Sequence, residues 1–404
     1  MTDKHTTDFI LAHRDDEVRT LALRFSRDKT IDLPAVLEQI AGWQTARRKI
    51  PSWAATEGIA YPPRLSMEQC SGEKAALYKA GVVRRITKPS ERTLLTDLTG
   101  GAGVDFAFMA PLFQRAVYVE RQERLCRTAI HNMRVLGINH ARIICADATA
   151  YIRNAAHSTV IFIDPARRDS AGRRTYAISD CAPDVLAMEN LLIGKARVVM
   201  LKLSPMLDLS KTIQDLNANE AGNVVREAHI VAVDNECKEL LMVLSADYAG
   251  STKIFCSDND HVFSYGWDDN GGHPPRKSIA PQAMESGMYV YVPSVAVMKA
   301  GCFPLLCSRF GVEAVGPNSH VFLSPKPVEG FPGRRFRASA VASMNKKELR
   351  QVLQGVERAN ITVRNFPLTA DGLRQRIRIP DGGDTYLIAT TAAKRHIIIV
   401  THKA

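Results

Sequence analysis

The sequence has no run of about 18 consecutive apolar residues, so it predicts no membrane-spanning helix. Its first residues lack the charged-then-apolar pattern of a secretory signal peptide. Its eight cysteines include no C-x-x-C pair and no spacing typical of metal ligands. We therefore expect a cytoplasmic protein with reduced thiols and no bound metal.

Acidic residues are scarce at one end of the chain. Residues 331–404 contain 14 Lys and Arg against 5 Asp and Glu, so they carry +9 of the net charge of +11. Such a basic segment favours a polyanionic partner. It also has few aromatic residues, which argues for contact with phosphates or duplex shape rather than stacking on single-stranded bases. The alternative is a cationic surface that serves only solubility.

The length of 404 residues predicts two or three domains. Residues 1–60 have apolar positions at helical spacing and predict a helical N-terminal region. Strand-like and helix-like segments alternate over residues 61–248, which predicts an α/β domain. Turn-forming residues then accumulate, and we expect residues 249–330 to form a linker and a small α+β unit. Residues 331–404 follow the order β-α-β-α-β-β.

The α/β domain is organised around residues 94–105, where a short apolar run ends at Asp97 and apolar positions at helical spacing begin at Val104. Three glycines lie between them, Gly100, Gly101 and Gly103. This order predicts a strand, a tight turn and a helix, in which the backbone can approach a ligand near free N–H groups. Phe106 stands where a dinucleotide-binding fold has its third glycine, which argues against a dehydrogenase.

Four successive predicted strands end on or beside a carboxylate. They cover residues 94–98, 116–120, 142–147 and 159–164, and the carboxylates are Asp97, Glu120, Asp147 and Asp164. A strand at 197–203 and a closing pair at 229–233 and 240–244 bring the number to seven. Val/Ile-rich runs separated by helices predict a mostly parallel sheet covered on both faces. Ligands bind beyond the carboxyl ends of such strands, so the four carboxylates should line one site.

These features resemble the class I S-adenosylmethionine-dependent methyltransferases. Residues 97–103, Asp-Leu-Thr-Gly-Gly-Ala-Gly, are similar to motif I of that superfamily, with Thr99 in place of its first glycine. The resemblance implies a Rossmann-like core and S-adenosyl-L-methionine as the cofactor. It also implies that Asp97 holds the glycine turn and the methionine end, and that Asp147 meets the adenine amino group. A carboxylate such as Glu120 can accept both ribose hydroxyls.

The polar segment before the first strand often folds over the cofactor in this superfamily. On that resemblance Gln69 and Ser71 are further candidates, although Ser71 could instead cap a helix predicted over residues 72–83. The predicted cofactor-binding set is therefore Gln69, Ser71, Asp97, Thr99, Gly100, Gly101, Gly103, Glu120 and Asp147.

The fourth strand continues as Asp164-Pro-Ala-Arg-Arg, which resembles the Asp/Asn-Pro-Pro-aromatic turn of enzymes that methylate base amines. There the acid and the first proline hold the amine, so Asp164 and Pro165 are the predicted catalytic residues. Methyl transfer is a direct displacement, in which alignment and desolvation supply much of the acceleration. Ala166 and Arg167 stand where the second proline and the ring belong. Tyr176 could supply a ring or could equally pack as a loop anchor.

The loop that follows is rich in arginine. Its four guanidinium groups could clamp a nucleic-acid backbone at the mouth of the site, because arginine forks match phosphate geometry. A solvated loop is the alternative. The predicted substrate-binding residues are Arg167, Arg168, Arg173, Arg174 and Tyr176.

Most of the chain resembles a bacterial methyltransferase family with a helical N-terminal part, a class I core, a ferredoxin-like insert and a C-terminal THUMP-like domain. The matching segments are Glu68-Gln-Cys-Ser, residues 97–103, Asp164-Pro-Ala-Arg-Arg, Lys202-Leu-Ser-Pro and Asn235-Glu-Cys-Lys-Glu-Leu. THUMP domains belong to tRNA-modifying enzymes, so the resemblance implies an RNA substrate, and tRNA is the class of RNA that it favours. The alternatives are a methyltransferase of a small molecule or protein, and a non-catalytic RNA-binding protein. The basic segment argues against the former, and the intact carboxylate series against the latter.

Overall fold

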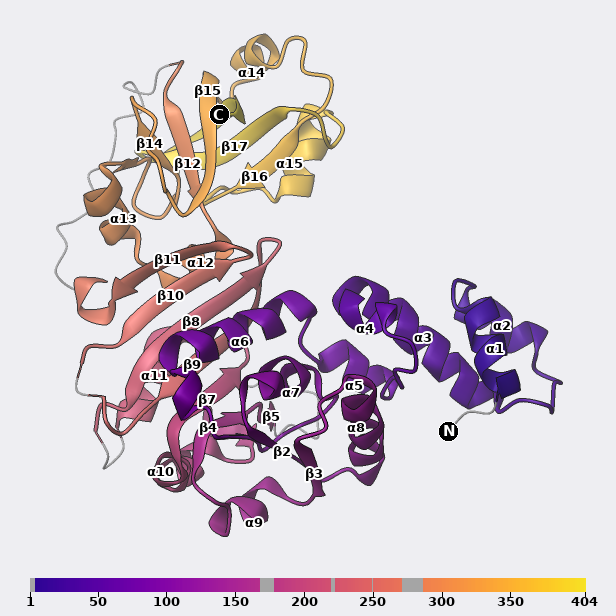
Figure 1. Cartoon of the computed structure of the whole chain (residues 1–404). Helices are drawn as coiled ribbons and strands as arrows, with labels where there is room; N and C mark the ends of the chain where they lie inside the picture. The colour runs from indigo at the N-terminus through magenta and orange to yellow at the C-terminus, as the bar shows by residue number, and fades with distance from the viewer. Residues whose placement is uncertain (1–3, 168–177, 219–221, 249, 271–285) are drawn as a thin grey trace. The chain divides into compact units, whose positions relative to one another are not determined.

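The computed structural model describes residues 4–167, 178–218, 222–248, 250–270 and 286–404 (Figure 1). The chain divides into two compact units. Unit 1 is Met1–Val233 with Lys238–Gly250, and unit 2 is Asp234–Cys237 with Ser251–Ala404. Within the described ranges, no helix combines the length and the apolar character needed to cross a membrane.

Unit 1 begins with helices. These are α1 (Lys4–His13), α2 (Val18–Arg24), α3 (Leu33–Lys49), α4 (Pro51–Ala55), α5 (Arg64–Gln69) and α6 (Glu73–Ile86). Leu21, Ile31, Val36 and Ile40 form a small core of their own among the first three helices. Asp32 caps α3, because its carboxylate accepts a hydrogen bond from the backbone N–H of Ala35.

The rest of unit 1 is an α/β sheet. Its strands are β1 (Leu94–Asp97), β2 (Arg115–Glu120), β3 (Ala141–Cys145), β4 (Ser158–Ile163), β7 (Ala196–Leu203), β8 (Val225–Val233) and β9 (Glu236–Leu244). Their order is β3-β2-β1-β4-β7-β9-β8. The first five strands pair in parallel, whereas β9 runs antiparallel to β7. The predicted Rossmann-like, mostly parallel seven-stranded core is confirmed.

Helices cover this sheet and bury its central strands. They are α7 (Val104–Met109), α8 (Glu123–Val135), α9 (Ala148–Arg153), α10 (Val185–Lys195) and α11 (Leu209–Asn217), together with α6. Every residue of β4 is buried, as a strand with both faces covered requires. The strands change order at β1 and β4, so the site is expected at the carboxyl ends of these two strands.

Unit 2 opens with a hairpin of β10 (Lys253–Asp258) and β11 (His261–Gly266). The expectation of an irregular linker over this segment was therefore wrong. Ile254 and Cys256 alternate with less buried residues along β10, so the segment has an apolar face to bury. The polar residues between the strands form the hairpin turn, with Asn259 at a φ of 52°.

A seven-stranded sheet forms the rest of unit 2. Its strands follow the order β13 (Glu313–Ala314), β14 (Phe322–Ser324), β12 (Tyr289–Pro293), β15 (Gly333–Ser343), β18 (Arg395–Lys403), β17 (Thr385–Ala392) and β16 (Asn360–Val363). The helices are α12 (Val295–Ala300), α13 (Phe303–Phe310), α14 (Lys346–Val352) and α15 (Ala370–Ile377). Because β15 pairs with both β12 and β18, the segments before and after residue 331 share one sheet.

Candidate active site

The glycine turn joins β1 to α7. Gly101 and Gly103 have φ angles of 53° and 81°, a region that favours glycine. Gly100 has a different role, because a Cβ there would lie 2.0 Å from Cε2 of Tyr118. The hydroxyl of Tyr118 donates to the carbonyl of Gly101 at 2.6 Å. At Gly100 the missing side chain therefore makes room for this ring, and the contact of Gly100 with a cofactor stays a prediction.

Two carboxylates accept hydrogen bonds from the backbone of the turn and the residues beside it. Glu120, at the end of β2, accepts hydrogen bonds from the backbone N–H of Gly101 at 3.1 Å and of Gln122 at 2.8 Å. Asp97, at the end of β1, accepts one from the N–H of Thr99 at 3.0 Å. Asp97 is only 1% exposed, and burial, with the nearby carboxylates, raises its pKa well above the usual value.

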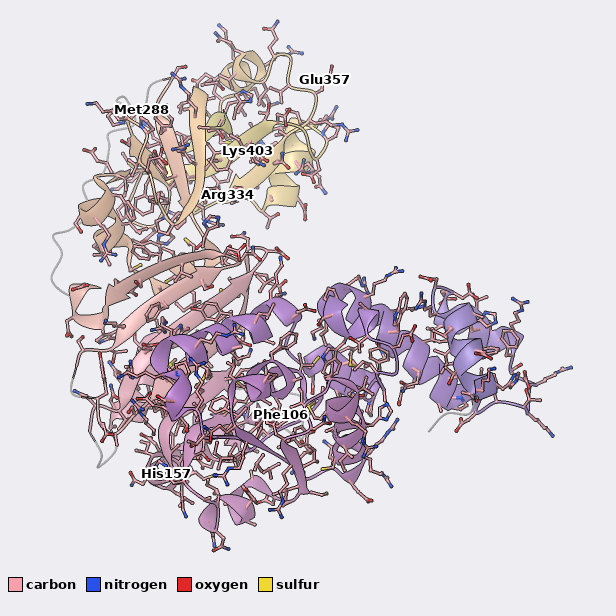
Figure 2. All side chains as sticks on the ribbon, viewed as in Figure 1. Phe106, His157, Met288, Arg334, Glu357 and Lys403 are labelled. Carbon is pink, nitrogen blue, oxygen red and sulfur yellow. The ribbon has the colours of Figure 1, made fainter. Side chains whose placement is uncertain are left out.

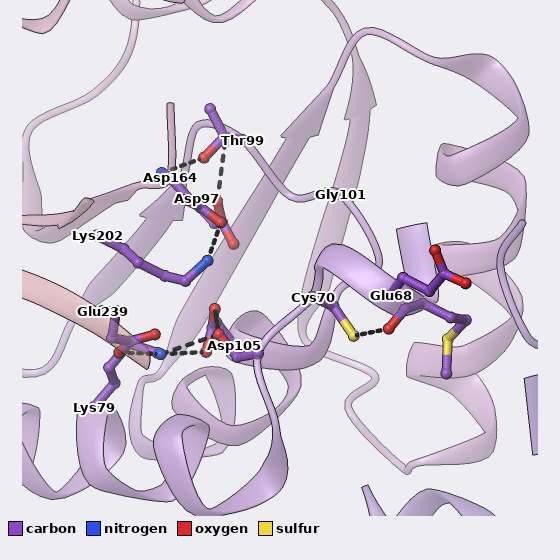
Figure 3. Close-up of polar contacts among 12 residues, drawn as sticks. Glu68, Cys70, Lys79, Asp97, Thr99, Gly101, Asp105, Asp164, Lys202 and Glu239 are labelled. Carbon is purple, nitrogen blue, oxygen red and sulfur yellow. Dashed lines mark hydrogen bonds and ion pairs between the residues drawn. The ribbon is translucent and has the colours of Figure 1, made fainter. Parts of the chain in front are cut away.

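Thr99 links the turns after β1 and β4 (Figure 3). Its Oγ1 accepts a hydrogen bond of 2.6 Å from the backbone N–H of Asp164. On the other side, Lys202 at the end of β7 donates from Nζ to Oδ2 of Asp164. Burial alone would lower the pKa of Lys202, but the charges of Asp164 and of the other nearby carboxylates raise it above its usual value. Lys202 is therefore a cation at neutral pH.

A second buried lysine lies close to this pair (Figure 3). Lys79 of α6 is fully buried, and its Nζ lies 2.5 Å from Oε1 of Glu239 and 3.1 Å from Oδ1 of Asp105. The same nitrogen donates to Ser71 Oγ at 3.1 Å, and Ser71 donates to Oδ2 of Asp105 at 2.8 Å. Burial raises the pKa of Glu239. Three segments of unit 1 thus meet at one ion cluster.

Ser71 does not cap the helix that follows it. Gly72 occupies the N-cap of α6 and provides no side-chain hydrogen bond. The hydroxyl of Ser71 instead bonds Asp105 and Lys79, because Asp105 in α7 offers a buried carboxylate that needs donors. Gln69 is exposed at the last residue of α5. The structure therefore brings Ser71, but not the side chain of Gln69, into the cluster.

Asp147 follows β3 and is exposed. Its Oδ1 accepts from the N–H groups of Thr149 at 2.9 Å and Ala150 at 3.0 Å, so it caps α9. This cap would account for an aspartate here without any cofactor. The contact with adenine therefore stays a prediction.

The predicted substrate loop is described only in part. Pro165 is buried, and Arg167 lies in the short strand β5 (Ala166–Arg167), which pairs with β6 (Cys181–Ala182). Arg168, Arg173, Arg174 and Tyr176 lie outside the described residues.

Sequence reasoning gave no role in the site to Lys79, Asp105, Lys202 or Glu239, although the segments that contain Lys202 and Glu239 match the family. Lys202 had a usable signal, since it ends a predicted strand at the same edge as Asp164. Lys79 had none, because it looks like an ordinary helix residue and its partner Glu239 lies 160 residues away. Among the residues that the structure describes, no group of three or more His, Cys, Asp or Glu side chains could hold a metal ion.

Comparisons with known proteins agree with this geometry. A THUMP domain-like family model matches residues 333–403, and a ferredoxin-like domain model matches residues 289–332. The crystal structure of a "putative methyltransferase" from Porphyromonas gingivalis W83 is 30% identical, covers 100% of both chains and has a TM-score of 0.84. No curated protein matches the chain.

Partial matches have low identity. An rRNA methylase from Streptococcus thermophilus is 14% identical over 43% of this chain and 94% of its own, with a TM-score of 0.31. A SAM-dependent methyltransferase from Agrobacterium tumefaciens is 16% identical over 43% of this chain and 61% of its own, with a TM-score of 0.30. The assignment therefore rests on the full-length relative.

The fold and the full-length match define a methyltransferase with a class I core. Within that class, the chain belongs to the bacterial methyltransferase family with a C-terminal THUMP-like domain.

Proposed function

We propose that the protein transfers a methyl group from S-adenosyl-L-methionine to an amine, or a similar nucleophile, of an RNA base. The observation that carries this proposal is the hydrogen bond between Thr99 and Asp164, which joins the glycine turn, the proposed cofactor site, to the turn after β4, the proposed acceptor site. We propose tRNA as the RNA class.

The donor set of the glycine turn suits the cofactor. Each oxygen of Glu120 accepts one backbone N–H, and a carboxylate oxygen has a second lone pair that can accept a ribose hydroxyl. The sulfonium of the cofactor supplies an electrophilic methyl group and a neutral leaving thioether.

Asp164 is placed to orient the acceptor. Lys202 and Thr99 fix its carboxylate and its backbone, so one carboxylate oxygen can accept a hydrogen bond from an amine in a set direction. Lys202 stays protonated, so it cannot act as the base. The acceptor's proton passes to the carboxylate of Asp164 or to solvent as the new carbon–nitrogen bond forms.

The RNA part of the proposal rests on unit 2. The THUMP-like match and the net charge of residues 331–404, +9 of +11, both favour a polyanion. A methyltransferase of a small molecule or protein would leave this charge with solubility as its only role. A non-catalytic RNA-binding protein would not need the carboxylates that this chain keeps at the strand ends, Asp97, Glu120 and Asp164.

Two measurements test the proposal. Calorimetry should show binding of S-adenosylmethionine, and Glu120→Ala should weaken it by about 1.5–3 kcal/mol, the range for hydrogen bonds to a charged group. Glu123→Ala is the control, because Glu123 is an exposed acid on the neighbouring helix. Equal affinity of the Glu120 variant and the wild type would exclude the ribose contact. Mass spectrometry of tRNA and rRNA nucleosides from a deletion strain should show the loss of one methylated nucleoside.

A further inference from the structure

Unit 2 carries three cations on one face of its sheet, labelled in part in Figure 2. Arg334 and Phe336 alternate with Arg335 along β15, so they lie on the face opposite to Arg335. Lys403 of β18 is the direct partner of Phe336 and shares its face. Arg364 directly follows β16 and lies two residues after Thr362, whose hydroxyl accepts a hydrogen bond from Arg334, so it shares this face. We call Arg334, Arg364 and Lys403 the Arg334 cluster.

Aromatic rings hold two of these cations in place. The guanidinium of Arg334 lies 5.6 Å from the centroid of the Phe336 ring, and Lys403 Nζ lies 5.6 Å from that of Tyr386. The two rings are 4.9 Å apart. Arg334 Nη2 also donates to Thr362 Oγ1 at 3.4 Å. The cations are therefore oriented before any ligand binds.

The positive charge of the cluster is not neutralised. Within the described part of the chain, no carboxylate forms an ion pair with Arg334, Arg364 or Lys403. Burial lowers the pKa of Arg364, and the nearby charge of Arg334 lowers it further. Like charges held together in this way repel each other, and a bound anion would remove the repulsion.

Two buried donors, one on Arg364 itself and one on the neighbouring Thr390, also lack an acceptor among the described residues. Val363 pairs with Ala389, so Arg364 and Thr390 occupy the next position on adjacent strands. Among the described residues, neither the buried Nε–H of Arg364 nor the buried hydroxyl of Thr390 has a hydrogen-bond partner. Buried donors are rarely left unpaired, so an acceptor from outside the chain, a water or an anion, is expected at this end of the cluster.

The opposite face of the same strands differs. There Arg335 pairs with Glu329 at 2.7 Å and donates to the carbonyl of Ala404 at 3.3 Å. Arg337 lies against the ring of Tyr289 at 5.9 Å. These residues line an open groove of about 750 Å³, which Lys403 also borders at its edge of the sheet. The carboxylate of Glu329 compensates part of the charge in this groove, which makes it the weaker anion site.

We propose that the Arg334 cluster binds phosphate groups of the RNA backbone, an inference that rests on the proposed RNA methylation. Arginine forks match phosphate oxygens, and two arginines with a lysine can meet adjacent phosphates. Phe336 is only 1% exposed and cannot stack on a base. The cluster therefore positions the RNA without reading its sequence.

Point variants of the full chain test this site. Deleting residues 331–404 would also remove β15, the partner of β12, and so disrupt the remaining sheet. We would measure the affinity for unfractionated tRNA over a range of salt concentrations. Arg334→Gln and Arg364→Gln should each weaken binding by about tenfold or more and reduce the salt slope by about 1. Arg334→Lys keeps the charge but loses the fork, so its affinity should be intermediate.

Arg337→Gln is the matched control, since it removes the same charge from the other face of β15. A smaller loss in this variant supports the cluster. An equal loss in all three glutamine variants would mean that only net charge matters and would overturn the proposal. So would a larger loss in Arg337→Gln, which would place the RNA in the groove.

Binding of inorganic pyrophosphate and of S-adenosylmethionine distinguishes a failure of this site from a failure of the proposed function. If cluster variants keep full tRNA affinity, the site fails while RNA methylation stands. If tRNA does not bind the wild type but pyrophosphate does, in a way that needs Arg334, the RNA assignment falls and the cluster is a site for a small phosphorylated compound. The affinity for S-adenosylmethionine should be unchanged in every variant. A changed value would show that the substitution acts through the fold and not through a phosphate contact, which would overturn the site.

Discussion

The backbone N–H of Asp164 donates a hydrogen bond of 2.6 Å to Oγ1 of Thr99, so the turn after β4 is tied to the glycine turn after β1 (Figure 3). In the motif that the sequence resembles, glycine stands where this chain has Thr99. A glycine has no side chain to accept this bond. The threonine that departs from the motif therefore supplies the hydrogen bond that joins the two turns.

Replacing Thr99 tests this contact. Thr99→Val keeps the size of the side chain but leaves the partly buried N–H of Asp164 without its acceptor. The free energy of unfolding should therefore fall by about 1–3 kcal/mol. Thr99→Ser keeps the hydroxyl and should be close to the wild type. Urea denaturation measures both, and a valine variant as stable as the serine variant would contradict the link.

Asp164 and Lys202 should affect turnover rather than cofactor affinity. Asp164→Asn keeps the shape but weakens acceptance of a hydrogen bond, and should lower kcat by about 100-fold, the cost of misplacing a reactant. Lys202→Met frees the carboxylate and should lower kcat less. Single-turnover assays and calorimetry with S-adenosylmethionine separate the two effects. Loss of cofactor binding in parallel with kcat would place Asp164 in the cofactor site or the fold.

Lys79 should be essential for stability. Lys79→Met leaves Asp105 and Glu239 as uncompensated buried carboxylates and should cost about 3–5 kcal/mol of unfolding free energy. Adding Glu239→Gln removes one of these charges and should restore part of the loss. Arg84→Met, an exposed change on the same helix, is the control. A double variant no more stable than Lys79→Met alone would show that the charges are not coupled.

Acid should weaken unit 1 through Glu227. Burial alone would raise the pKa of Glu227, but hydrogen bonds from Arg85 and His229 lower it to about 2. A depressed pKa stabilises the fold above the ordinary value of 4.5, and this contribution is lost as the pH falls from there towards 2.

The size of this effect is limited by solvent, because the Arg85 side chain is 44% exposed. We expect about 1–3 kcal/mol. Urea midpoints of the wild type and Glu227→Gln should differ at pH 6 and converge as the pH approaches 2. A constant difference would show that the carboxylate does not titrate with folding.

Local sequence determined the core of unit 1 well. Val/Ile runs, the glycine turn and the strand-end carboxylates predicted the parallel sheet and placed Asp97, Glu120 and Asp164 at one edge, because strand direction follows from chain order. The same reasoning failed for the hairpin at Lys253–Gly266, where Asp and Asn in the turn obscured two short strands with one buried face each.

What only the tertiary structure decided is how distant charges pair. Ser71 looked like a helix cap, yet a carboxylate 34 residues away takes its hydroxyl. Lys79 meets Glu239, and Arg334 meets Thr362 and acts on Arg364, through contacts between strands and helices far apart in the chain. Periodicity and motifs report which face of an element is buried, whereas the partner of a buried charge depends on which elements the fold brings against that face.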